Sequence, residues 1–329
     1  MLDRLRFPEK DTMQQILRTT AYVLGVSAIA AMPAGCGGAI SSNIPAPASA
    51  VQPSSVFARP AHHGSSSLLY VSDVGDSTVT VYSPASGKPV STLEVPPAPE
   101  GECTNSAGTV WIANEDAAAI VEYAHDNTKQ VAKLGDPGNY PSGCSVSPKT
   151  GDLAVANIAS NNGGPAGELS IYADAKGSPT IYQDAGIYRY YYCGYDSSGD
   201  LFVDGIQQDG KFVFAELPSG ASKLTVLTLK QSISTPGGVQ WDGKHIAVGD
   251  AATSTIYQLS ISGNTASVVG TVDIKGGNAA AYYVDGTDVV ALITSSSEVG
   301  TWKYPAGGKP TSTLKLTGTD EPFDVVVSQ

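Results

Sequence analysis

The stretch YPSGCSVSPKTGDLAVAN, residues 140–157, determines how the chain is interpreted. It places a lone cysteine, Cys144, ahead of a polar turn that contains Gly151 and Asp152, and an apolar run follows the turn. Four other segments share this plan: GECTNSAGT, YCGYDSSGD, GGVQWDGK and AAYYVDGTD. Cys144 therefore marks one strand of a repeat, and we interpret it as structural rather than as a reactive or metal-binding residue.

The repeat has the period of a propeller blade. Five units carry an apolar strand ending in Asp or Asn, a polar turn, and a second strand ending near Tyr or Leu; a sixth, VVALITSSSEVGTWKYPAGG, keeps the strands but loses the acidic end. These pairs recur every 41 to 48 residues, and a further β-rich segment follows each of them. Their starts are Leu69, Val110, Leu153, Leu201, His245 and Val289. Four strands in ~40 to 50 residues are typical of a β-propeller blade.

The two ends of the repeat region are expected to complete one blade. The first unit has no inner strand ahead of it, whereas the chain ends in PFDVVVSQ, which fits that place with nothing after it. Pairing residues 324–328 with residues 68–73 would leave no open sheet edge. The 36 Gly, 21 Pro and 16 Tyr, with 15% charged residues, also favour strands and turns over long helices. We predict an all-β, six-bladed β-propeller of four-stranded blades over residues 68–329.

The first 36 residues predict export. Basic residues precede AYVLGVSAIAAM, residues 21–32, which has the length of a signal-peptide core and is too short to span a bilayer alone. The next residues, Ala34-Gly35-Cys36, resemble the lipobox of bacterial lipoproteins, although Pro33 stands where that motif usually has Leu. We predict lipidation at Cys36 and a membrane-anchored, extracytoplasmic protein. Cleavage near Ala34 without lipid, an uncleaved anchor and a misassigned start are the alternatives.

A linker separates this segment from the repeats. Residues 37–67 are rich in Gly, Ser, Pro and Ala and show no sustained period, which predicts a flexible tether. His62 and His63 lie within it, without a nearby Cys or acidic partner, and are expected to be solvated.

Two repeat families resemble this chain over residues 68–329. GCSVSPKTGDLAVAN looks like the repeat of NHL-type propellers, and LLYVSDVGDSTVTVYSPASGKPVSTLEV is similar to the YVTN-type repeats of bacterial surface propellers. The resemblance implies an extracytoplasmic binding protein or scaffold, with hydrolases and lyases a minority among proteins of this shape.

A more distant resemblance is to gluconolactonase-type hydrolases, which are six-bladed and hold a divalent metal in the channel. In that family the ligands include a Glu on the first inner strand, an Asn in a Pro-Asn-Gly turn and an Asp in a Pro-Asp-Gly turn. Glu321 could match the first, but the two turns read Pro141-Ser142-Gly143 and Pro236-Gly237-Gly238. A hard cation would lose most of its oxygen ligands, so neither a metal nor a cofactor is predicted.

The remaining cysteines share the inner-strand position of three successive units. Cys103, Cys144 and Cys193 are interpreted as free buried thiols, with one disulfide or a three-thiolate metal site as alternatives. A second repeated feature is a set of acidic or amide strand ends, expected to bond turn backbone rather than to form a ring of ligand-binding groups. These residues are Asp73, Asn114, Asn157, Asp204 and Asp250.

The segment IYRYYYCGYD, residues 187–196, has more tyrosines than the repeat requires. Because strand side chains alternate, some of them are expected in the core. The long turn NIASNNGGPAGE, residues 157–168, should leave the ring at the same end. Exposed aromatic and amide groups suit carbohydrate or peptide binding. The predicted binding residues are Tyr188, Arg189, Tyr190, Asn161 and Asn162.

The charge and the scarcity of histidine narrow the function. A net charge of -12 repels phosphate backbones, so nucleic acid is not a predicted partner. Four His and no Ser-His-Asp order, P-loop or dinucleotide motif leave little catalytic machinery. We predict a binding or interaction module at the cell envelope, with carbohydrate, peptide or another envelope protein as partner, rather than an enzyme. A gluconolactonase-like or other hydrolase that uses the central channel is the alternative.

Overall fold

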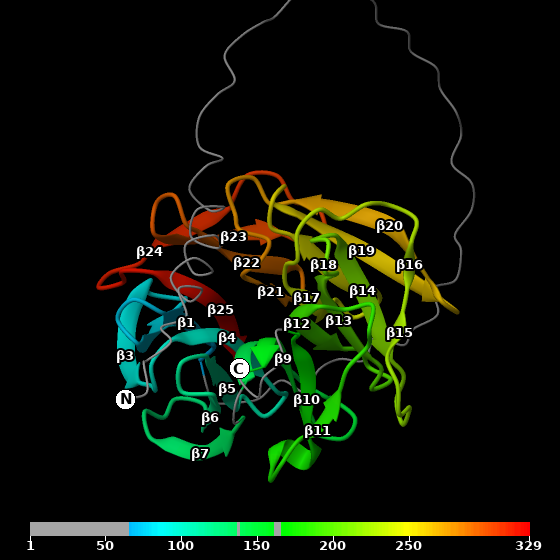
Figure 1. The fold of residues 1–329 in the computed structure, drawn as a ribbon. Coiled ribbons are helices and arrows are strands. Elements are labelled where there is room, and N and C mark those ends of the chain that lie inside the picture. The colour runs from blue at the N-terminus through cyan, green and yellow to red at the C-terminus, as the bar shows by residue number, and fades with distance from the viewer. Residues whose placement is uncertain (1–65, 137–138, 161–165) are drawn as a thin grey trace, which may run out of the picture. The chain divides into compact units, whose positions relative to one another are not determined.

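The computed structural model describes residues 66–136, 139–160 and 166–329. These residues form six sheets arranged around a common axis, and β-strands account for nearly all of the regular structure (Figure 1). The prediction of an all-β, six-bladed propeller is therefore confirmed. The predicted signal segment 1–36 and almost all of the predicted linker 37–67 lie outside the described residues.

Each blade has four antiparallel strands, ordered from the inner strand outward. Blade 1 contains β25 (Pro322–Ser328), β1 (Leu68–Asp73), β2 (Thr78–Ser83) and β3 (Lys88–Glu94). Blade 2 contains β4 (Pro99–Thr104), β5 (Val110–Asn114), β6 (Ala119–Tyr123) and β7 (Gln130–Gly135). Blade 3 contains β8 (Asn139–Val146), β9 (Leu153–Ser160), β10 (Glu168–Tyr172) and β11 (Thr180–Tyr182), with the short 3-10 turn η1 (Ala173–Ala175) after β10.

The second half of the ring repeats this order with one irregularity. Blade 4 contains β12 (Arg189–Tyr195), β13 (Leu201–Ile206), β14 (Phe212–Leu217) and β15 (Thr225–Val226). Blade 5 contains β17 (Val239–Trp241), β18 (Ile246–Asp250), β19 (Thr255–Ser262) and β20 (Thr265–Asp273), and β16 (Thr228–Leu229) pairs parallel with its outer edge. Blade 6 contains β21 (Tyr282–Asp285), β22 (Asp288–Ile293), β23 (Glu298–Lys303) and β24 (Ser312–Lys315).

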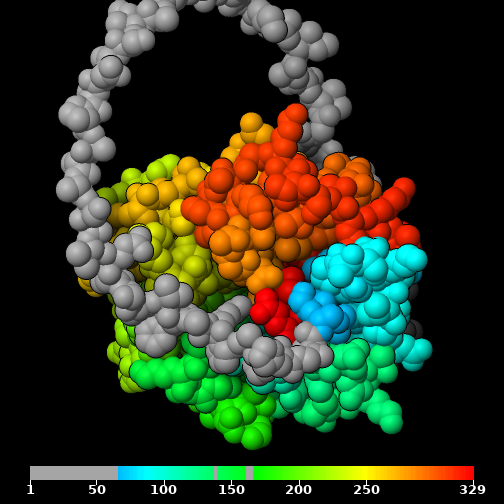
Figure 2. All heavy atoms as spheres, turned by 180° about the vertical axis from the view of Figure 1, so that it is seen from behind, coloured from blue at the N-terminus to red at the C-terminus, as the bar shows by residue number. Residues whose placement is uncertain are grey.

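The first and last of these strands in the sequence close the ring. β1 pairs antiparallel with β25, from Leu68 opposite Ser328 to Asp73 opposite Pro322. Figure 2 shows the C-terminal segment, in red, beside the start of β1, in blue. The predicted pairing of residues 324–328 with residues 68–73 is confirmed, and it extends to Pro322.

The hydrophobic core lies between neighbouring blades because strand side chains alternate. In β1, Tyr70 packs in a cluster with Ile112 of blade 2, whereas the next residue, Val71, packs in a cluster with Leu292 of blade 6. Each of the six junctions within the described ring contains one such cluster. A side chain shifted by one position along its strand would therefore face the opposite neighbour.

Candidate functional site

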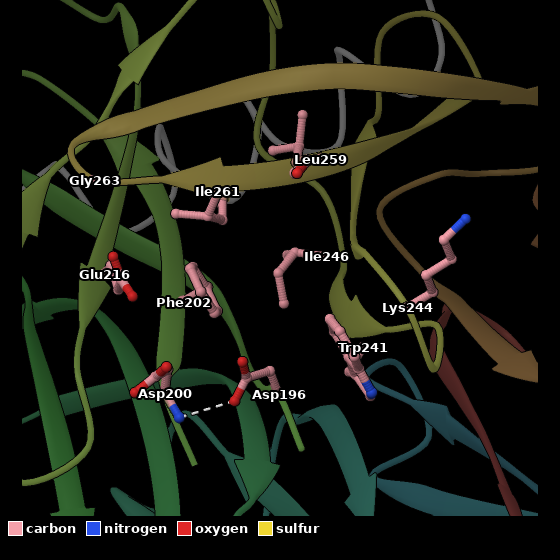
Figure 3. Close-up of a pocket in the computed structure, with 11 residues that line it drawn as sticks. Asp196, Asp200, Phe202, Glu216, Trp241, Lys244, Ile246, Leu259, Ile261 and Gly263 are labelled. Atoms are coloured by element: carbon pink, nitrogen blue, oxygen red, sulfur yellow. Dashed lines mark hydrogen bonds between the residues drawn. The ribbon is translucent and has the colours of Figure 1, made fainter. Parts of the chain in front are cut away.

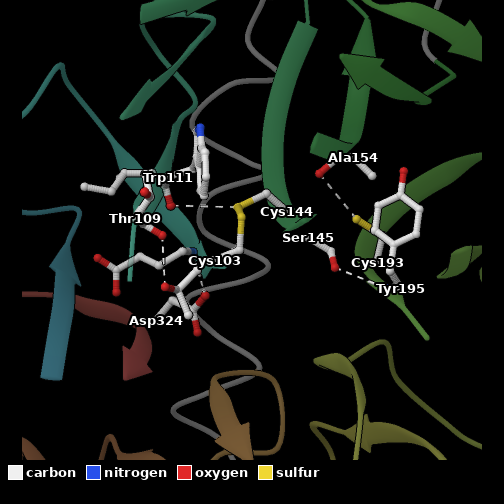
Figure 4. The surroundings of a disulfide bond; sticks show 12 residues. Cys103, Thr109, Trp111, Cys144, Ser145, Ala154, Cys193, Tyr195 and Asp324 are labelled. Carbon is white, nitrogen blue, oxygen red and sulfur yellow. Dashed lines mark hydrogen bonds between the residues drawn. A yellow bond between two sulfur atoms is a disulfide. The ribbon is translucent and has the colours of Figure 1, made fainter. Parts of the chain in front are cut away.

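Two of the inner-strand cysteines form a disulfide between neighbouring blades. Cys103 lies on β4 and Cys144 on β8, and their Cα atoms are 5.6 Å apart (Figure 4). Both residues are buried. The interpretation of these two cysteines as free thiols is wrong, and the alternative of one disulfide is correct.

Strand register explains why these two cysteines meet. Cys103 is paired with Trp111 of β5, and the residue paired with the equivalent Ala154 of β9 is Ser145. Cys144 therefore lies one position earlier in its strand than Cys103 does. Because side chains alternate, Cys103 faces blade 3 and Cys144 faces blade 2, so the two sulfur atoms lie in one junction.

Cys193 on β12 is a free thiol, as predicted. Its Sγ lies 3.8 Å from the carbonyl oxygen of Ala154, just as Sγ of Cys144 lies 3.8 Å from that of Trp111. It thus faces blade 3, where the position corresponding to Cys103 holds Ser145 instead of a cysteine. Burial raises the pKa of the Cys193 thiol far above its ordinary value, so the thiol stays protonated. With the other two sulfurs bonded, a three-thiolate metal site is ruled out.

Three buried carboxyls lie on the inner strands of blades 1 and 2. Burial raises the pKa of Glu100 well above its ordinary range, and the carboxylate of Glu115 adds to this rise. Burial likewise raises the pKa of Glu102, with a further contribution from Asp324. Both carboxylate oxygens of Glu102 lack a hydrogen-bond partner in the described part of the chain. These inner strands therefore favour protonated carboxyls.

Asp324 is the buried carboxyl on the closing strand. Burial raises its pKa to about 7, although the backbone N–H groups of Glu102 and Val325 donate to its two oxygens at 2.9 and 2.8 Å and oppose the rise. Folded chains therefore bind a proton here that unfolded chains release near pH 4.

The acidic and amide strand ends are structural. The carboxylate of Asp73 accepts from the turn N–H of Asp76 and from the N–H of Asp320, and that of Asp250 accepts from Ala252. The prediction that they bond turn backbone is thus confirmed for these two carboxylates.

The other three strand ends differ from that prediction in detail. The amides of Asn114 and Asn157 donate to neighbouring strand atoms, the carbonyl oxygen of Ile112 and Oγ of Ser170 respectively. Asp204 lies one position earlier than the other strand ends, and its carboxylate joins blade 4 to Gly237 of blade 5 at 2.9 Å.

The turns compared with the gluconolactonase ligands are filled by packed backbone. A Cβ at Gly143 would lie 2.7 Å from the carbonyl oxygen of Tyr191, and one at Gly237 would lie 2.6 Å from that of Ala279. No side chain fits at either glycine without moving a neighbouring blade. Among the described residues, no three His, Cys, Asp or Glu side chains are grouped to hold a metal ion.

The predicted tyrosine-rich site is only partly exposed. Tyr190 has none of its surface accessible, and its hydroxyl accepts from the N–H of Asp184 at 2.8 Å, so the expectation of an exposed ring is wrong here. Tyr188 is half-buried, and the half-buried Arg189 guanidinium lies 5.5 Å from its ring centre. Asn161 and Asn162 lie outside the described residues. Ligand binding by Tyr188 and Arg189 stays a prediction.

A solvent-accessible cavity lies between blades 4 and 5, at the end of the ring where the inner strands turn into the second strands. We call it the blade 4–5 groove; its volume is about 390 Å³. Its apolar floor consists of Phe202, Ile246 and Leu259, which are buried, and Trp241 and Ile261 line it as half-buried walls (Figure 3). Strand register places these side chains on the two facing blade surfaces.

Carboxylates surround one side of this floor. The acidic rim consists of Asp196 and Asp200, on the turn between β12 and β13, and Glu216 on β14. Burial raises the pKa of Glu216, and the carboxylates of Asp200 and Asp196 add to the rise. Lys244 lines the groove from blade 5, and Figure 3 shows its amino group pointing away from the acidic rim. The groove therefore places a few apolar side chains beside a negative edge.

The groove lies where the fold departs from its repeat. The N–H of Leu227 donates to Phe214 of blade 4, whereas the N–H of Thr228 donates to Asn264 of blade 5. The chain thus crosses between the blades beside Gly263, which lines the groove. The β19–β20 hairpin is also long, with strands of 8 and 9 residues. Sequence patterning missed this site because the residues that line it come from the turns and strands of two blades and form no motif in the sequence.

Comparisons with known proteins establish the fold but no family. No family model and no curated protein matches the chain. A chain in the crystal structure of a nidogen/laminin complex is similar, with 9% identity and a TM-score of 0.62, covering 80% of this chain and 98% of that chain. A protein of unknown function from Bacteroides caccae is 14% identical, with a TM-score of 0.58 and coverage of 80% and 100%. A functionally unknown protein from Desulfotomaculum acetoxidans DSM 771 is 11% identical, with a TM-score of 0.53 and coverage of 80% and 99%.

Proposed function

We propose that this propeller is an exported, lipid-anchored binding module of the cell envelope, with the blade 4–5 groove as its ligand site. The observation that carries the proposal is the groove itself. Its volume of about 390 Å³ lies within the range of ligand pockets, and its lining places the half-buried Trp241 and Ile261 beside a few charged groups.

The inter-blade disulfide supports the extracytoplasmic part of the proposal. Disulfides persist in oxidising compartments and are rare in cytosolic proteins, and the bond between Cys103 and Cys144 is buried in the ring. In this proposal the apolar run at residues 21–32 acts as the signal-peptide core that directs export. The lipobox-like Cys36 carries the lipid that anchors the protein to the membrane. Within the described ranges, no helix has the length and apolar character needed to cross a bilayer.

The class of macromolecular partner is a separate part of the proposal. One of the chains similar to this propeller comes from a nidogen/laminin complex, so a chain of this fold takes part in an assembly of two proteins. Carbohydrate, peptide or another envelope protein are the partners that we propose for the end of the ring that carries Tyr188. We also retain as a proposal the resemblance to NHL-type and YVTN-type repeats over residues 68–329.

A binding role is favoured over the gluconolactonase-like alternative. That alternative needs oxygen ligands at turns where this chain has Ser142 and Gly237, and packed backbone leaves no room for a side chain at Gly237. Binding in the blade 4–5 groove, by contrast, requires no residue that this chain lacks.

Ligand screening on two matched variants tests the binding role. Residues 62–329 form one compact unit whose blades close on themselves, so this unit is suitable for thermal melts with a compound collection. Ile261→Trp would fill the groove, whereas Val269→Trp adds the same ring at an exposed site on β20, outside the groove. Ligands that stabilise wild type and Val269→Trp but not Ile261→Trp support the proposal. Ligands that stabilise Ile261→Trp as strongly as they stabilise wild type would place the binding site elsewhere.

Cell fractionation tests the anchor. Wild-type protein should remain with membranes, and Cys36→Ser should leave the membrane fraction because it cannot be lipidated. Membrane retention of Cys36→Ser would contradict the lipid anchor without affecting the groove.

A further inference from the structure

The charges of the blade 4–5 groove indicate which ligand it takes; this inference rests on the proposed binding role. Three carboxylates line one side of the groove, and the single lysine among the lining residues faces away from them (Figure 3). A bound cation would reduce the repulsion among the carboxylates of the acidic rim, whereas an anion would increase it.

Some carboxylate oxygens of the acidic rim already accept hydrogen bonds from backbone N–H groups, and the others are available to a ligand. Oδ1 of Asp196 accepts from the N–H groups of Ser198 and Asp200 at 2.8 and 2.9 Å. Oδ1 of Asp200 accepts from the N–H of Ser219 at 2.7 Å. Their turn is therefore held in place, while the second oxygen of each carboxylate makes no hydrogen bond within the described ranges. The carboxylate of Glu216 makes no hydrogen bond or ion pair with the described residues.

The apolar surface beside these carboxylates suits the body of an organic molecule rather than a bare metal ion. Trp241 and Ile261 are half-buried and supply most of the accessible apolar surface, because Phe202, Ile246 and Leu259 beneath them are almost completely covered. An indole ring offers its face to a cation and its area to an apolar group. A hydrated metal ion would leave this surface without a partner.

We propose that the blade 4–5 groove binds a small organic cation, in which an ammonium group bonds the acidic rim and an aliphatic or aromatic body packs on the floor and on Trp241. Glu216 is the main charged contact because its carboxylate has no partner in the described chain. The cavity lies between two blades and opens to solvent, and its volume limits the size of the ligand.

Calorimetric titration with a matched series tests the charge. The probes are 2-phenylethylamine, 2-phenylethanol and 3-phenylpropanoate, which share a ring and differ in charge. The amine should bind at least tenfold more tightly than the alcohol, because hydrogen bonds to charged groups are about twice as strong as neutral ones. The acid should not bind, and amine affinity should fall as salt rises from low to physiological concentration.

Two conservative variants locate the contact. Glu216→Gln should weaken amine binding about tenfold and reduce its salt dependence. Glu122→Gln is the matched control, because Glu122 is also half-buried and is paired with Trp111 as Glu216 is paired with Phe202. It should bind the amine as wild type does.

Several results would overturn the proposal. Equal affinity for amine and alcohol would reject the cation while leaving the groove as a binding site. Amine affinity that is unchanged in Glu216→Gln would reject the acidic rim as the contact of the ammonium group. The amine could fail to bind at ~10 mM while the thermal screen still finds ligands that stabilise wild type but not Ile261→Trp. This result would reject the ligand class but retain the proposed function.

Discussion

Asp324 contributes to the pH dependence of the stability of the ring, and a single substitution should remove its contribution. Its pKa of about 7 in the folded chain lies above its ordinary value of 3.8. The folded state therefore holds this proton more tightly than the unfolded state does. Stability from this group is fully present below about pH 4 and is lost as the pH rises to about 7.

The magnitude follows from the two pKa values. A difference of about three between them corresponds to ~4 kcal/mol at pH 8, at 1.36 kcal/mol for each pKa unit. Asp324→Asn keeps the shape of the side chain and cannot ionise. Its NH2 group would face one of the N–H donors at Glu102 or Val325, which costs about 1 kcal/mol. We expect the variant to be about 3 kcal/mol more stable than wild type at pH 8.

Urea unfolding at pH 4 and pH 8, with the disulfide intact, measures this effect. At pH 4 the two proteins should agree within about 1 kcal/mol, because both are neutral at residue 324. Asp76→Asn is the control: it removes an exposed carboxylate from the same blade and should follow the wild-type pH dependence. A difference between Asp324→Asn and wild type that is the same at both pH values would refute the reasoning.

Three further predictions concern ring construction. Ser145→Cys should form a second disulfide with Cys193, because the residues repeat the register of Cys103 and Cys144; thiol titration of residues 62–329 should fall from one free thiol to none, and a count of two would contradict this. Replacing both Cys103 and Cys144 by Ala should lower the free energy of unfolding by about 4 kcal/mol, because the two residues are 41 positions apart in the sequence; an unchanged urea midpoint would contradict this. Deleting residues 322–329 removes β25 and should abolish cooperative melting, whereas an unchanged melt would contradict closure by the termini.

The blade count and the closure could be predicted from sequence because both depend on a period of about 44 residues. A slip of one or two residues in one unit does not change how many units there are. The closing strand was identifiable because one inner strand was missing at the start of the repeats and one was left over at the end. These features are global, and local irregularities do not hide them.

Side-chain direction could not be predicted because it depends on single positions. β4 and β12 each contain an irregularity of register, between Pro99 and Glu102 and between Tyr190 and Cys193. Each such bulge reverses the faces of the residues beyond it. This is why Tyr190 belongs to the core. The disulfide was not the favoured interpretation because adjacent inner strands could stand too far apart, whereas the Cα atoms of Cys103 and Cys144 are 5.6 Å apart. The groove includes Gly263, which lies next to the point where the chain changes blade after Leu227, and no residue pattern marks that crossing.

Hydrogen exchange on residues 62–329, with and without saturating 2-phenylethylamine, would test the binding role most directly. We predict slower exchange in segments 196–202 and 241–246, which contribute to the two sides of the groove, and no change near Tyr188. Protection that is confined to residues 187–190, or absent from both sides of the groove, would contradict ligand binding between blades 4 and 5.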